Sequence, residues 1–226
     1  MTPAPFLLHN RLIRIHQCYI GKKRLEAGIA QYRQRHPGTT DTFTTTWHPF
    51  YLNPHAPRQS IDKRQAYAAK FGGPERADAI FERITAAGAG DGIRFSFAGR
   101  TGNTRDSHRL LQLAGSKGEA AQTRTVEQLF TAYFELEKDI TSHEVLAAAG
   151  RDAGLDEAEV TRMLGSDEFG DVVDKEVAEA RSEAVSGVPH FTLQGQYEIS
   201  GAQEPAAFVR LFERIKAREG AGTAAM

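Results

Sequence analysis

The sequence predicts an α/β fold in which a large all-helical segment interrupts a smaller domain of mixed strands and helices. Segments typical of strands lie near the two ends of the 226-residue chain, and a series of helical patterns separates them. Short runs of β-branched and aromatic residues between turn residues indicate strands, whereas apolar residues spaced three or four apart indicate helices. We therefore expect the two ends to form one domain around the helical block.

The N-terminal part of the chain has the pattern of a strand, a helix and a second strand. Residues 11–15 are expected to form a short strand. A helix should follow from Tyr19 to Arg35, because His36-Pro37-Gly38 supplies residues that end helices. The segment from Thr42 to Trp47 is rich in β-branched and aromatic residues, which favour a second strand.

The middle of the chain is predicted to be helical. Ser60 can cap a helix that runs to Phe71. Pro74 suits the first turn of the next helix, which Gly88 and Gly90 terminate. Further helical patterns, separated by glycine or capping residues, cover residues 104–114, 122–136, 142–150, 156–164 and 168–184.

The C-terminal part of the chain is predicted to be a hairpin followed by a helix. Two short apolar runs flank Gln194-Gly195-Gln196, which is a hairpin signal. A final amphipathic helix from Pro205 to Arg218 places four apolar residues on one face, namely Phe208, Leu211, Phe212 and Ile215. The complete order is that of a thioredoxin fold with a large all-helical insertion.

This order predicts a discontinuous domain organisation. Residues 1–59 and 185–218 would form the thioredoxin-fold domain, residues 60–184 the helical insertion domain, and residues 219–226 a flexible tail. Residues 93–97 alternate in polarity, as a strand or an extended link within the insertion would.

Composition excludes several classes of function. The formal net charge of -1 gives no electrostatic reason to expect a nucleic acid partner. No apolar run approaches the roughly 20 residues that a membrane-spanning helix needs. The eight histidines lack the close spacing of common metal motifs, so no metal is expected. A single cysteine excludes an internal disulfide framework and favours a cytoplasmic location.

Several ordered motifs resemble the DsbA-like thioredoxin family, in particular its FrnE-like branch. The run Cys18-Tyr-Ile-Gly-Lys-Lys-Arg-Leu-Glu26 is similar to the active-site helix of that branch. Other similar segments are Trp47–Pro54, Asp62-Lys-Arg, Lys70-Phe-Gly, Asn103-Thr104, His108-Arg109-Leu110, Gly187-Val-Pro-His-Phe191 and Ile199-Ser-Gly-Ala-Gln203. The same fold houses 2-hydroxychromene-2-carboxylate isomerases and kappa-type glutathione transferases.

The resemblance assigns Cys18 to the second position of a Cys-x-x-Cys motif. In the family, the first cysteine attacks a partner disulfide as a thiolate at the helix N-terminus, and the second resolves the mixed disulfide. Glutathione-dependent relatives carry a serine at the first position. Here that position is Ile15, whose side chain can neither attack a disulfide nor hydrogen-bond a thiolate.

Three interpretations of Cys18 stay open. It is a buried apolar residue, which is the commonest fate of a lone cysteine. Alternatively, a related chain with a different N-terminus carries the full motif, because residues 1–17 match the family much less well than the next thirty. A third interpretation is residual thiol reactivity, with mixed disulfides to glutathione or a client protein.

The resemblance also implies a substrate-binding loop at Val188 and Pro189. A cis bond between them would present backbone groups of Val188 to an extended substrate. His16 could favour a nearby thiolate as an imidazolium, although an exposed surface histidine is the simpler expectation. Asn103 and His108 could face the cleft, with helix capping and an ordinary surface or interhelical histidine as the alternatives.

These observations predict an enzyme of the thiol-disulfide oxidoreductase class, with activity reduced or lost because of Ile15. Its partners would be protein or peptide thiols and disulfides, and no cofactor is expected to be bound. One alternative is an isomerase or transferase that uses glutathione as co-substrate on an aromatic or polyketide-like molecule. Another is a non-catalytic module that binds peptides or ligands. The protein could also form a homodimer.

Overall fold

The computed structural model describes residues 6–12, 16–182 and 187–224, and it contains a four-stranded mixed sheet. The sheet order is β2-β1-β5-β6, with β1 parallel to β2 and antiparallel to β5, and β5 antiparallel to β6. The strands are β1 (Phe6–Leu12), β2 (Phe43–Pro49), β5 (His190–Leu193) and β6 (Tyr197–Ser200). This arrangement confirms the predicted thioredoxin fold.

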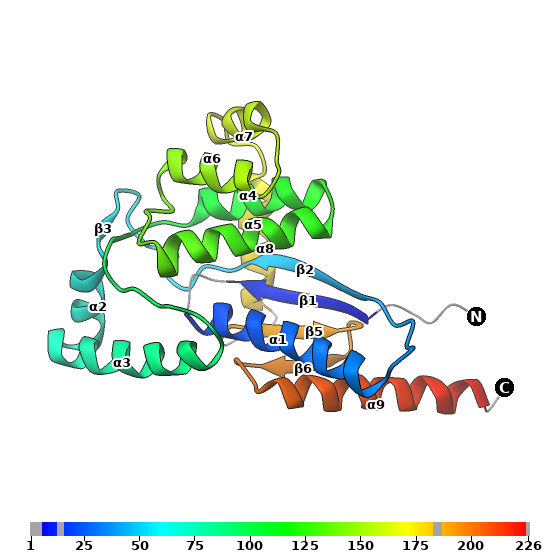
Figure 1. Ribbon diagram of the computed structural model, residues 1–226. Helices are drawn as coiled ribbons and strands as arrows, with labels where there is room; N and C mark the ends of the chain where they lie inside the picture. Colours follow the sequence, from blue (N-terminus) through cyan, green and yellow to red (C-terminus); the bar gives the residue numbers. More distant parts are fainter. Residues whose placement is uncertain (1–5, 13–15, 183–186, 225–226) are drawn as a thin grey trace.

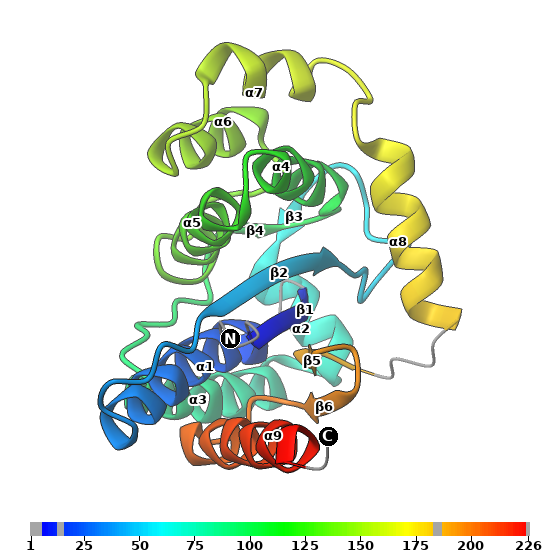
Figure 2. The ribbon, with the colours of Figure 1, turned by 90° about the vertical axis from the view of Figure 1, so that its right-hand side faces the viewer.

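Helices cover both faces of this sheet. Helix α1 (His16–Arg35) and helix α9 (Pro205–Ala224) pack against each other on one face (Figure 1). Helix α8 (Gly170–Ser182) lies on the opposite side of the sheet (Figure 2). The four apolar residues expected on one face of α9 are all buried. Helix α9 continues to Ala224, past the predicted end at Arg218 and into the segment expected to be a flexible tail.

The first strand is earlier in the sequence than the pattern suggests. The prediction placed it at residues 11–15, whereas β1 spans Phe6–Leu12, and residues 13–15 lie outside the described part of the chain. Phe6 and Leu8 point into the core while Leu7 faces outward, as the two-residue period of a strand requires. Asn10 continues the buried row, and this polar residue in a core position obscures the alternation.

The inserted segment between β2 and β5 is mainly helical, but it departs from the predicted all-helical segment by one small sheet. Its small two-stranded sheet pairs β3 (Ile61–Asp62) with β4 (Arg100–Thr101). A π-helical turn, η1 (Thr131–Glu135), directly follows α5. The remaining helices are α2 (Lys63–Phe71), α3 (Pro74–Gly90), α4 (Arg105–Ser116), α5 (Glu119–Phe130), α6 (His143–Asp152) and α7 (Glu157–Leu164).

One local prediction in this segment needs correction, and one alternative that was left open is decided. Helix α2 is capped by Asp62 and not by Ser60, because the Asp62 carboxylate accepts a hydrogen bond of 2.8 Å from the Gln65 N–H. Residues 93–97 form an extended link without a strand partner. Ile93, Phe95 and Phe97 are nevertheless all buried, so the alternation reflects packing against the helices.

Helix α1 joins two hydrophobic clusters. Near its beginning, Cys18, Tyr19 and Ile20 belong to a cluster that includes Trp47 and the apolar residues of the inserted helices. Further along, Leu25 and Tyr32 belong to a second cluster with the sheet and α9. The start of α1 is therefore enclosed by the insertion, and this enclosure decides what the residues there can reach.

Candidate functional site

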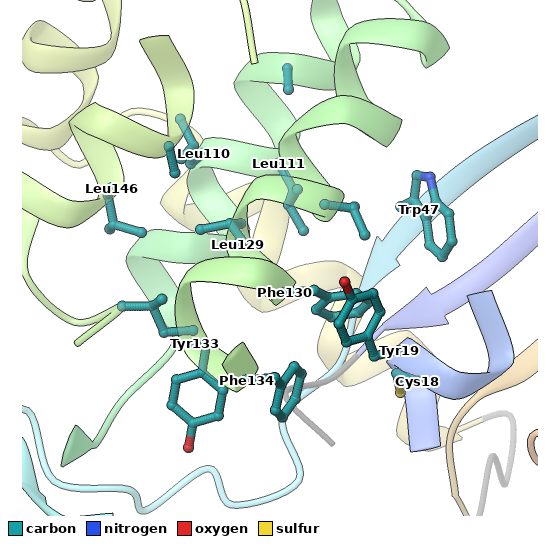
Figure 3. Packing of buried hydrophobic residues seen from close by; sticks show 14 of the residues in the cluster. Cys18, Tyr19, Trp47, Leu110, Leu111, Leu129, Phe130, Tyr133, Phe134 and Leu146 are labelled. Carbon is teal, nitrogen blue, oxygen red and sulfur yellow. The ribbon is translucent and has the colours of Figure 1, made fainter. Parts of the chain in front are cut away.

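Cys18 is the third residue of α1 and has no exposed surface. Tyr19, Phe130 and Phe134 lie close to it in the cluster that fills the space between α1 and the inserted helices (Figure 3). Ile15, which the motif aligns with the first active-site position, lies outside the described residues. A disulfide or thiol in solution therefore has no direct access to the sulfur of Cys18.

The loop before β5 packs against α1 one turn after Cys18. The bond between Val188 and Pro189 is cis, which is the isomer expected, and Pro189 is buried. A Cβ atom placed on Gly21 would lie 2.8 Å from Cγ of Pro189. Since residues three apart share a helix face, Cys18 and the contact with Pro189 lie on one side of α1. The structure thus brings these two predicted elements together.

His16 is buried, contrary to the expectation of an exposed histidine. Its exposed fraction is 2 %, and its Nε2 atom is buried without a hydrogen-bond partner. Burial, together with the charge of Lys63, lowers the pKa of His16 to about 3, so the imidazole is neutral at pH 7. It cannot act there as an imidazolium that favours a thiolate. Four aromatic rings lie around it, those of Tyr67, Phe95, Phe97 and Phe134.

The sequence pattern gives no sign that two polar residues near α1, Lys63 and Asn10, are buried. Lys63 has no exposed surface, donates a hydrogen bond of 3.0 Å to the carbonyl oxygen of Tyr133, and lies 4.0 Å from the centre of its ring. Asn10 is equally buried, and neither side-chain amide atom has a hydrogen-bond partner. Both residue types usually lie at the surface, so only the three-dimensional structure could identify them.

Asn103 lies just before α4 and His108 lies in its first turn. The side-chain oxygen of Asn103 accepts a hydrogen bond of 2.8 Å from the backbone N–H of Arg105, the first residue of α4, while Thr104 occupies the N-cap position. His108 is buried, and its Nδ1 lies 2.7 Å from the carbonyl oxygen of Thr104. It borders a cavity of about 30 Å³, which Phe130 also lines. His108 is therefore an interhelical residue and not a surface one.

A larger cavity of about 500 Å³ opens beside α2 and the loop after β2. Its size is within the range of small-molecule sites. Tyr67 lines this cavity and also contacts the ring of His16, with 6.0 Å between ring centres. Tyr133 and Lys70 supply a phenol ring and a cation, and most other lining residues are apolar: Leu52, Ala56, Pro57, Ile61, Ala66 and Ala69.

The basic residues of α1 have structural partners. Lys22 is 3 % exposed and pairs with both Glu26 and Glu127, and Lys23 contacts the same Glu127 carboxylate. Although burial opposes ionisation, the hydrogen bonds from the two lysines lower the pKa of Glu127. Arg24 binds Asp91 at 2.9 Å. These ion pairs connect α1 to α5 and to the end of α3, so they stabilise the position of the helix.

Among the residues that the structure describes, no group of three or more histidine, cysteine, aspartate or glutamate side chains has the arrangement of a metal site. None of the helices in the described ranges has the length and apolar composition required to span a bilayer.

Comparison with known proteins agrees with this geometry. A model of the DSBA-like thioredoxin domain matches residues 16–213. The structure of a probable DsbA oxidoreductase from Streptomyces coelicolor is 26% identical, with a TM-score of 0.82 over 92% of this chain and 89% of that chain. The comparison with curated proteins found no match.

Two more distant structures share the fold. A 2-hydroxychromene-2-carboxylate isomerase has a TM-score of 0.66 at 16% identity, over 97% of this chain and 98% of that chain. A candidate protein disulfide isomerase from Nitrosomonas europaea has a TM-score of 0.68 at 15% identity, over 95% and 99%. At these identities the likeness establishes the fold alone.

Proposed function

Because this chain belongs to the DsbA-like thioredoxin family, we propose that it binds extended peptides at the loop of Val188 and Pro189 and does not itself exchange disulfides. The observation that carries this proposal is the complete burial of Cys18, the only cysteine. The protein would act as a binding member of a family of oxidoreductases. We further propose a cytoplasmic location, supported by the single cysteine, which fractionation of cells would test.

Disulfide exchange makes two demands that this chain does not meet. A thiolate must reach the sulfur of the partner disulfide, and a second thiol must resolve the mixed disulfide. Cys18 has no exposed surface, and the sequence offers no second thiol. Neutral His16 supplies no positive charge to favour a thiolate. Loss of exchange would leave the loop of Pro189 in place, because Pro189 packs against Gly21 and bonds Gly201.

The packing of the loop supports the proposal of peptide capture. Pro189 is fixed against Gly21 on one side, and its carbonyl oxygen accepts a hydrogen bond of 2.8 Å from the N–H of Gly201. Val188, just before it, is half-buried, so part of this residue faces solvent. A backbone segment held in this way could pair with a peptide through backbone hydrogen bonds, as a strand does.

Peptide binding can be separated from redox activity with three variants. We would measure the affinity for a fluorescent, cysteine-free extended peptide, and the rate of insulin reduction by dithiothreitol. Cys18→Ser should leave peptide affinity unchanged. Val188→Pro removes the backbone N–H at this position and should weaken peptide binding at least tenfold, whereas Val188→Ala keeps that N–H and should bind normally.

Two results would contradict the proposal. One is insulin reduction by the wild-type protein that Cys18→Ser abolishes, since that would assign exchange to the buried thiol. The other is a failure of any extended peptide to bind at micromolar protein concentrations. Thermal unfolding of each variant would show whether the loop substitutions leave the fold intact.

A second candidate function, the binding of a small aromatic molecule, rests on the 500 Å³ cavity. The rings of Tyr67 and Tyr133 could contact an aromatic substrate, and Lys70 could pair with a carboxylate on it. Calorimetry with aromatic carboxylates, with and without glutathione, would test this function. We expect Lys70→Met to weaken carboxylate binding, and the absence of heat with every compound would rule against this function.

A further inference from the structure

Two histidines on neighbouring strands lie on the sheet face away from α1. In β1, Asn10 is paired with Trp47 of β2, and both side chains are buried on the side of α1. His9 and His48 lie one position away from these residues, so they point to the other face. Helix α8 lies on that side of the sheet (Figure 2). This pair is therefore separate from Cys18 and from the loop of Pro189.

The two histidines belong to a chain of contacts that crosses four elements. Nδ1 of His9 is 3.1 Å from Nε2 of His48, and Nδ1 of His48 is 2.8 Å from the carboxylate of Glu176 in α8. The other oxygen of Glu176 accepts a hydrogen bond of 2.7 Å from the side-chain amide of Gln112 in α4. Glu176 is thus held on both of its oxygens.

Glu176 determines which nitrogen of His48 is free to bind a ligand. A carboxylate is an acceptor, so the hydrogen bond requires the proton of a neutral His48 to be on Nδ1. The lone pair is then on Nε2, the atom directed at His9. A carboxylate behind a histidine is the arrangement that orients metal-binding histidines and raises their basicity. The ring of His9 is exposed, and in the tautomer with its proton on Nε2 its Nδ1 also offers a lone pair.

From this geometry we propose that His9 and His48 form a two-nitrogen site for a divalent transition-metal ion. Zinc and similar ions bind imidazole nitrogen at about 2.0–2.1 Å. Two nitrogens 3.1 Å apart at that bond length subtend an angle of roughly 100° at the metal, close to the tetrahedral and square-planar values. One ion could therefore replace the proton that now lies between the rings.

The chemistry of the donors selects the class of ion. Imidazole suits copper, nickel and zinc, whereas magnesium and calcium prefer oxygen ligands. Among such ions, Cu²⁺ should bind most tightly. With two protein ligands in the described part of the chain, water would complete the coordination, and the ion would be exchangeable. A bound ion would connect β1 to β2 and stabilise the folded state only.

Copper titration of the tag-free protein tests this site. We would follow Cu²⁺ binding by calorimetry and by electron paramagnetic resonance, with Zn²⁺-induced thermal stabilisation as a second measurement. We expect one saturable site with two nitrogen ligands. His9→Gln and His48→Gln should each abolish that site, and Glu176→Gln should weaken it about 10–100-fold. His190→Gln, which removes another histidine from the same sheet face, is the matched control and should bind normally.

Two outcomes would overturn the proposal. One is the absence of saturable binding to the wild-type protein. The other is unchanged affinity in both His9→Gln and His48→Gln, which would place the copper elsewhere and leave the two rings as a hydrogen-bonded pair. Circular dichroism of the metal-free variants would show whether each is folded, and His9, which is exposed, should be replaceable without loss of structure.

Discussion

Acidification should unfold this protein partly through His16. The imidazole is neutral in the folded state, where burial and nearby Lys63 lower its pKa to about 3, compared with 6.5 for an ordinary histidine. Between these two values the unfolded chain binds a proton that the folded chain excludes. The contribution of His16 to stability is therefore fully present above pH 6.5 and is lost as the pH falls toward 3.

The size of this loss follows from the two pKa values. Each pH unit below 6.5 lowers the free energy of unfolding by about 1.4 kcal/mol until the pKa of the folded state is reached. At pH 4 the loss is about 3 kcal/mol relative to pH 7. This loss can be measured by urea denaturation of the wild type and of His16→Phe at pH 7 and at pH 4. Other groups titrate in both proteins, so the difference between the two pH dependences isolates His16.

His16→Phe should lose about 3 kcal/mol less stability than the wild type between pH 7 and pH 4. It should also be more stable at pH 7, because it replaces a buried nitrogen that lacks a partner. If the two proteins lost the same stability on acidification, His16 would be protonated in the folded state. That result would contradict the burial of His16 among aromatic rings at the start of α1.

The remaining predictions concern other contacts near α1. Gly21→Ala should destabilise the protein by up to about 2 kcal/mol, because the clash with Pro189 outweighs the gain in helix propensity. Gly90 has open space around it, so Gly90→Ala is the control and should leave the protein equally or more stable. Equal shifts in melting temperature for Gly21→Ala and Gly90→Ala would refute the packing of Pro189 on α1. Asn10→Leu should raise the free energy of unfolding by about 1–3 kcal/mol, since it removes two buried polar atoms without partners; a decrease would show that the amide is hydrogen-bonded.

The sequence was sufficient to predict the order of the elements. Turn residues and apolar periodicity located the hairpin around Gly195 and the buried face of α9, because both depend on local geometry. The position of β1 was wrong because Asn10 occupies a core position and breaks the alternation of apolar and polar residues. The cap of α2 was assigned to Ser60 instead of Asp62, two residues of similar capping preference.

The candidate site was less predictable, because its properties depend on contacts between distant segments. Cys18 and Pro189 were identified by motif, and the structure places both on one side of α1. The burial of His16 arises from rings contributed by α2, η1 and the link at residues 93–97, which no local pattern connects. The burial of Lys63 has the same origin, because its partner Tyr133 is far away in the sequence.

The accessibility of the Cys18 thiol tests the central claim most directly. Ellman's reagent reports a free thiol as it reacts, and the unfolded protein in urea gives the full signal of one sulfur. We predict that the folded protein does not react over the time in which the unfolded protein reacts completely, because Cys18 has no exposed surface. Rapid reaction of one thiol per chain in the folded state would contradict this account and would restore Cys18 as a candidate for disulfide exchange.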